Sequence, residues 1–128
     1  SWYESKVVLN AIEQAQVFLR EMGEFFPYAS VIEPDGDVRP YALYAEGDEL
    51  NPTWMAGKLH ELLDKDLDEG KIDGYVLCVN VLVREPGIGI KVDAASLHLV
   101  QRGHDPITYY LKYQGTGKEM RFFEPFVA

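Results

Sequence analysis

The sequence predicts a single α+β domain, residues 1–128, with an antiparallel sheet of about six strands and two helices packed on one face. Two segments repeat apolar residues at helical spacing, and later segments alternate or cluster them as strands do. Short turns rich in glycine and proline join most of the strands, which indicates antiparallel neighbours. The content of 47% apolar and 26% charged residues is typical of a globular chain. The expected element order is αββαββββ.

The first predicted element is a helix that ends before Gly23. Val8, Ile12, Ala15, Leu19 and Met22 recur at spacings of four, three, four and three residues, so they share one face of a helix. Glycine adopts the left-handed conformation that closes many helices, which makes this glycine a natural end. The apolar face predicts that the helix packs against a sheet.

Two strands are predicted next, at residues 25–32 and 38–45. The turn between them contains Gly36, which tolerates the positive φ that a tight hairpin needs. Pro27 and Pro40 cannot donate hydrogen bonds to a sheet ladder. The hairpin is therefore expected to supply an edge strand or a bulged strand.

The second helix is predicted to begin at Asn51 and Pro52 and to end at Gly70. An asparagine side chain can accept from free N–H groups at a helix start, and proline suits the first helical position. The apolar stripe of this helix consists of Met55, Leu59, Leu62, Leu63 and Leu67.

Four strands are predicted in the remainder, at residues 75–83, 90–101, 107–113 and 119–127. Both faces of the first are largely apolar, which indicates a central strand that helices cover on at least one side. In the second, the apolar positions are even-numbered at its start and odd-numbered at its end. A bulge near residues 94–96 would reconcile the two halves.

This order of elements supports two resemblances. The first seven elements resemble those of profilin-like and roadblock-like domains, which implies the fold alone and carries no function. Residues 25–44, together with the stretch Tyr109–Tyr113, resemble small bacterial proteins of uncharacterised function. That second resemblance covers about half of the chain and implies no activity.

Charge is distributed unevenly along the chain. Residues 1–70 carry 15 Asp and Glu against 5 Lys and Arg, whereas residues 71–128 carry 6 against 7. An acidic surface attracts basic proteins and repels nucleic acid and anionic lipid. We therefore expect a non-catalytic interaction protein, comparable to inhibitors and immunity proteins, that binds a basic protein partner. The candidate contact residues are Asp64, Asp66, Asp68 and Glu69, followed by Glu46, Asp48 and Glu49.

The segment from Asp64 to Asp73 has the alternating aspartates of a calcium loop but the wrong register. Glu69 occupies the position that requires glycine, and Tyr75 occupies that of the closing glutamate. Four carboxylates at a helix C-terminus are unfavourable for the helix dipole, which favours a partner that brings positive charge there. No histidine pattern typical of a metal site is present, so neither metal nor cofactor is expected.

The alternative is a small-molecule-binding domain or an enzyme with a pocket between helix and sheet. Aromatic residues would line this pocket and a histidine would titrate in it. Ser96 and His98 would share one face of a strand, but no orienting carboxylate or oxyanion hole accompanies them. The candidate lining residues are Trp54, His60, Tyr41, Tyr75 and His98.

Other features limit the environment and the partners. Cys78 is the one cysteine and cannot form an internal disulfide, which is typical of a reducing, cytoplasmic location. No segment resembles a secretory signal or a membrane span. Tyr109, Tyr110 and Tyr113 lack the basic groove that base stacking requires, so no nucleic-acid partner is expected. Unpaired sheet edges would allow a homodimer.

Overall fold

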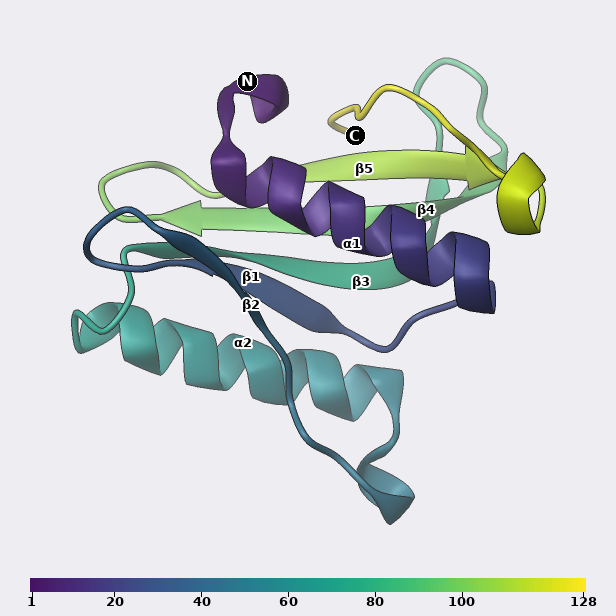
Figure 1. Ribbon diagram of the computed structural model, residues 1–128. Coiled ribbons are helices and arrows are strands. Elements are labelled where there is room, and N and C mark those ends of the chain that lie inside the picture. The colour runs from purple at the N-terminus through teal and green to yellow at the C-terminus, as the bar shows by residue number, and fades with distance from the viewer.

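The computed structural model describes all residues, 1–128, and confirms the α+β class (Figure 1). One six-stranded antiparallel sheet runs in the order β2-β1-β3-β4-β5-β6. The helices are α1 (Lys6–Met22) and α2 (Pro52–Asp68), with three short 3-10 turns, η1 (Trp2–Glu4), η2 (Gly47–Glu49) and η3 (Gly117–Glu119). The strands are β1 (Tyr28–Ile32), β2 (Val38–Tyr41), β3 (Gly74–Arg84), β4 (Lys91–Gln101), β5 (Ile107–Gln114) and β6 (Arg121–Phe122).

The two helices cover opposite faces of the sheet, so the prediction that both pack on one face is wrong. Successive residues of a strand point to opposite sides. In β3, Val76 and Cys78 pack with α1, whereas Tyr75 and Leu77 pack with α2. Because β3 is apolar on both faces, each face needs its own helix to exclude water.

The face under α1 holds the larger of the two cores. Ser5 begins the helix by accepting a hydrogen bond from the N–H of Val8 at 3.4 Å, and Gly23 ends it at φ 77°. The side chains that pack under this helix are Val7, Val8, Ala11, Ile12, Ala15, Tyr28, Val76, Cys78, Ala95, Leu97, Tyr109 and Leu111. The predicted apolar face of the first helix is confirmed for Val8, Ile12, Ala15 and Leu19, whereas Met22 is exposed.

The face under α2 holds a smaller core. Asn51 accepts from the N–H of Trp54 at 3.0 Å, and Pro52 opens the helix as predicted. The buried members of this core are Ala29, Val31, Leu59, Leu63, Ile72, Tyr75 and Leu77. They belong to α2, β1 and β3, together with Ile72, which precedes β3. On this side of the sheet, the helix packs on β1 and β3.

The long pair β3–β4 is regular from Gly74↔Gln101 to Arg84↔Lys91, so the predicted bulge at residues 94–96 is wrong. The apolar positions change phase because they belong to different faces. Leu97 faces α1, whereas Val92 lies on the other face, close to the turn that joins β3 and β4.

The first two strands and the last strand are shorter than predicted. The first strand starts at Tyr28, and the ring of Phe25, where the strand was expected to begin, packs against the rings of Phe18 and Tyr28. The last strand covers only Arg121–Phe122 and is followed by a single bridge between Tyr110 and Phe126. β2 is an edge strand, as its proline predicts.

Candidate functional site

The seven predicted contact carboxylates lie at the two ends of α2. Asp64, Asp66, Asp68 and Glu69 are at its C-terminal end, and Glu46, Asp48 and Glu49 precede its first turn. A helix of 17 residues is about 25 Å long. The predicted acidic surface is therefore two separate groups, which require separate description.

At the C-terminal end, two carboxylates already have partners within the chain. Asp64 accepts a hydrogen bond from the hydroxyl of Tyr75 at 2.6 Å and lies 3.1 Å from Nε2 of His60. Glu69 pairs with Nζ of Lys71 at 2.9 Å, and this ammonium lowers the pKa of the Glu69 carboxyl below its ordinary value. These contacts give both carboxylates a structural role.

The positive charge that this acidic helix end needs comes from Arg102, in the turn between β4 and β5. Its Nη2 donates to the carbonyl oxygens of Leu67 at 2.5 Å and Ile72 at 3.1 Å, and its Nε lies 3.7 Å from a carboxylate oxygen of Asp73. The guanidinium thus satisfies carbonyls that a helix C-terminus leaves free. The unfavourable dipole is offset within the chain, without an external partner.

At the N-terminal end, Glu46, Asp48 and Glu49 take part in no ion pair. Their one side-chain hydrogen bond comes from the hydroxyl of Tyr44, which donates to Glu46 at 3.0 Å. Three large apolar side chains in the same segment are exposed. We call the six residues the Trp54 surface: Tyr44, Glu46, Asp48, Glu49, Leu50 and Trp54.

Sequence reasoning missed Tyr44 and Leu50 as members of this surface. The exposed fractions are 82% for Tyr44, 47% for Leu50 and 40% for Trp54, which is high for side chains of this size. The sequence did contain a pattern that could have identified this surface, because apolar residues stand between acidic ones just before the predicted helix start. Their exposure follows from η2, which carries the chain beyond the sheet before α2 begins (Figure 1).

Three of the five predicted pocket residues come together on the α2 face. The ring centroid of His60 lies 6.2 Å from that of His98 and 6.4 Å from that of Tyr75. Nδ1 of His98 is 2.8 Å from the hydroxyl oxygen of Thr108 on β5. Partial burial, together with the neighbouring His60, lowers the pKa of the His98 imidazole. We call Asp64, His60, Tyr75, His98 and Thr108 the His98 cluster.

The other two predicted pocket residues do not join this cluster. Tyr41 ends β2, where its ring lies under the guanidinium of Arg39, and Trp54 lies in the first turn of α2. Ser96 shares a face with His98, but no hydrogen bond joins the two, so a Ser–His dyad is not formed. No group of three or more His, Cys, Asp or Glu side chains is arranged to hold a metal ion.

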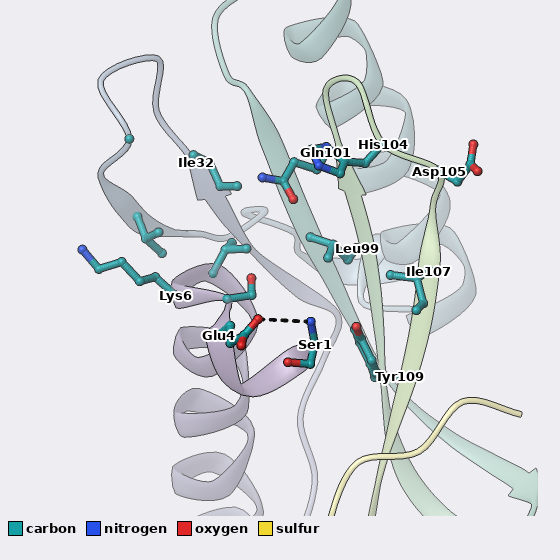
Figure 2. A pocket seen from close by; sticks show the side chains of 14 residues that line it. Ser1, Glu4, Lys6, Ile32, Leu99, Gln101, His104, Asp105, Ile107 and Tyr109 are labelled. Carbon is teal, nitrogen blue, oxygen red and sulfur yellow. Dashed lines mark ion pairs between the residues drawn. The ribbon is translucent and has the colours of Figure 1, made fainter.

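A hollow of about 520 Å³ opens on the α1 face, between the start of α1, the β1–β2 turn and the adjoining ends of β4 and β5 (Figure 2). Its apolar lining includes Ile32, Val38, Leu99 and Ile107. None of the five residues predicted to form a pocket lines it. The hollow lies on the α1 face of the sheet, and the His98 cluster lies on the opposite face.

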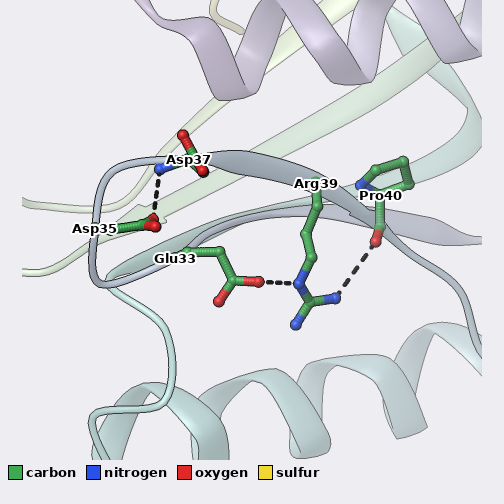
Figure 3. A network of polar contacts seen from close by, with 5 residues as sticks. All are labelled: Glu33, Asp35, Asp37, Arg39 and Pro40. Carbon is green, nitrogen blue, oxygen red and sulfur yellow. Dashed lines mark hydrogen bonds and ion pairs between the residues drawn. The ribbon is translucent and has the colours of Figure 1, made fainter.

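The β1–β2 hairpin beside this hollow carries its own polar contacts (Figure 3). Arg39 donates from Nε to the carboxylate of Glu33, and Asp35 accepts from the N–H of Asp37 at 3.0 Å. Gly36 has φ 94°, the conformation for which the sequence predicted a glycine. The charges of Glu33 and Arg39 are thus paired locally.

Comparison with known proteins finds no family model, no curated protein and no solved structure that matches this chain. The resemblances of element order and of residues 25–44 therefore stay predictions. Neither α1 nor α2 combines the length and the apolar content that crossing a membrane requires.

Proposed function

We propose that this chain is a non-catalytic interaction protein that binds a basic protein partner through the Trp54 surface. One observation carries the proposal. Glu46, Asp48 and Glu49 are free of ion pairs and stand next to three large exposed apolar side chains.

The chemistry of this surface suits a cationic partner. Tryptophan and tyrosine are enriched among the residues that dominate binding energy, because they bury a large area and lose little conformational freedom. Unpaired carboxylates around them accelerate association with a basic surface and repel acidic proteins. Trp54 and Tyr44 would supply affinity, and the carboxylates would supply selectivity.

The test is affinity capture from cells that produce this chain, with the wild type and two variants that lose equal charge. The first variant is Glu46→Gln/Asp48→Asn/Glu49→Gln. The control is Asp66→Asn/Asp68→Asn/Glu69→Gln, at the other end of α2. We expect the wild type and the control to retain the same basic protein, and the first variant to lose it.

The captured protein then allows a kinetic test. We expect the association rate with the purified partner to fall at least 10-fold between about 50 and 500 mM salt, because salt screens the steering charges. Equal retention by both variants would contradict the proposal. An association rate that does not depend on salt would contradict it as well.

A further inference from the structure

The hollow of about 520 Å³ on the α1 face contains an unpaired hydroxyl group at its base. Tyr109 on β5 lines the hollow and is 9% exposed; no protein group hydrogen-bonds to its hydroxyl, which remains accessible to water. Figure 2 shows the hydroxyl end of this side chain turned toward the space beside Leu99. We propose that the hollow binds a small, neutral molecule that has an apolar ring or chain and one group that hydrogen-bonds to Tyr109.

The other two buried tyrosines show that the free hydroxyl of Tyr109 is an exception. Tyr28 donates to the carbonyl oxygen of Ala11 at 2.7 Å, and Tyr75 donates to Asp64 at 2.6 Å. The hydroxyls of buried tyrosine rings usually find a partner in the protein, whereas that of Tyr109 is accessible to water. Tyr109 leaves this capacity open toward the hollow, where a ligand can use it.

Six of the fourteen residues that line the hollow are hydrophobic, and the core covers several of their side chains only in part. Ile32, Val38, Leu99 and Ile107 pack against the α1 core on one side and line the hollow on the other. They remain accessible because α1 begins at Lys6 and does not extend over this end of the sheet. A volume of about 520 Å³ lies within the range of sites for small molecules.

The charged residues around the hollow favour a neutral ligand. In Figure 2 the side chains of Lys6 and Asp105 point away from the space. The carboxylate of Glu4 pairs with the amino group of Ser1 at 3.8 Å. Gln101 lines the hollow with an uncharged amide. Because the charges of Lys6 and Asp105 lie outside the space, a charged ligand would lose its hydration without meeting a countercharge inside the hollow, whereas a neutral one avoids that cost.

The test uses indole as the probe, since its ring is apolar and its N–H can donate to a hydroxyl oxygen. Indole is titrated into ¹⁵N-labelled protein, and the amide shifts report both the site and the dissociation constant. We expect saturable shifts concentrated at the ends of β4 and β5, the β1–β2 turn and the start of α1. Tyr109→Phe should weaken binding roughly 3- to 10-fold, the effect of one hydrogen bond.

Tyr110→Phe is the matched control, because Tyr110 is the next residue of β5 and faces the other side of the sheet. It should bind indole with unchanged affinity. Val38→Phe, on the edge strand, narrows the hollow and should weaken binding irrespective of Tyr109. Non-saturating shifts at millimolar indole, shifts confined to the α2 face, or equal affinity in Tyr109→Phe and the wild type would each overturn the proposal.

Discussion

The two ends of α2 carry similar numbers of carboxylates but use them differently. At the C-terminal end, Tyr75, Lys71 and Arg102 contribute hydrogen bonds or positive charge from within the chain. At the N-terminal end the carboxylates have no cationic neighbour, and the side chains of Tyr44 and Trp54 beside them are exposed. The number of acids is therefore a poor guide to function.

The contacts of each carboxylate indicate its role more directly. A carboxylate that pairs within the chain contributes to stability, so its replacement changes the free energy of unfolding. A carboxylate that faces solvent without a partner contributes little to folding and remains available for binding. The comparison thus separates a structural end from the end that we propose binds a partner, and each can be tested by substitution.

Arg102→Ala should have the largest effect at the structural end. It removes the donors to Leu67 and Ile72 and the charge beside Asp73, so we expect a loss of about 1–3 kcal/mol in the free energy of unfolding. Urea denaturation measures this loss. Arg39→Ala is the control, because Arg39 is similarly exposed and pairs at the surface with Glu33.

The control variant should lose less than about 1 kcal/mol, the usual value of an exposed ion pair. Equal losses in both variants would show that Arg102 acts as an ordinary surface charge. The acidic helix end would then lack its internal compensation, and the case for an external basic partner at that end would return.

Tyr75→Phe should have the next largest effect. It removes the hydrogen bond to Asp64, and we expect a loss of about 1 kcal/mol, since the half-exposed carboxylate regains water. Burial and the adjacent carboxylate raise the pKa of the Tyr75 hydroxyl, so it remains a donor at neutral and moderately alkaline pH. Tyr110→Phe, whose hydroxyl forms no hydrogen bond, should be unchanged in thermal unfolding.

His98 should make stability depend on pH. Burial and His60 lower its pKa in the folded state, so the unfolded chain binds more protons as the pH falls. The contribution of His98 to the free energy of unfolding is fully present above the unfolded pKa of about 6.5, and it declines as the pH falls through that value. His60 and Asp64 from α2 and Thr108 from β5 face the imidazole.

Urea unfolding of the wild type and His98→Gln between about pH 8 and about pH 5 measures this slope. We expect the wild type to lose stability faster than the variant over the acidic half of this range. Identical slopes would show that His98 titrates alike in the folded and unfolded states, which would contradict the geometry of the cluster.

The parts of the fold that sequence predicted correctly depend on neighbours in the chain. Gly23, Gly36 and the pair Asn51–Pro52 act within one turn, so their positions in the sequence identify the turn or helix end they form. Which face a helix covers depends on residues far away. β3 is apolar on both sides. Whether helices cover one of its faces or both depends on the path of the chain in space.

The candidate site shows the same limit. Arg102 contacts Leu67 across 35 residues, and nothing in the turn that contains it signals this contact. His60, Tyr75 and His98 were selected for their chemistry and do lie together, whereas Trp54 and Tyr41 lie elsewhere. The hollow beside Tyr109 was not predicted, because its walls come from segments throughout the chain.

Trp54→Ala should have the smallest effect on stability and thereby tests the binding end most sharply. The side chain is 40% exposed, and it is the backbone N–H of Trp54 that the helix cap uses, which alanine retains. We expect a change below about 0.5 kcal/mol in the free energy of unfolding, together with loss of the basic partner in the capture experiment. A large loss of stability with the partner still retained would show that Trp54 is a packing residue. The distinction between the two ends of α2 would then rest on charge alone.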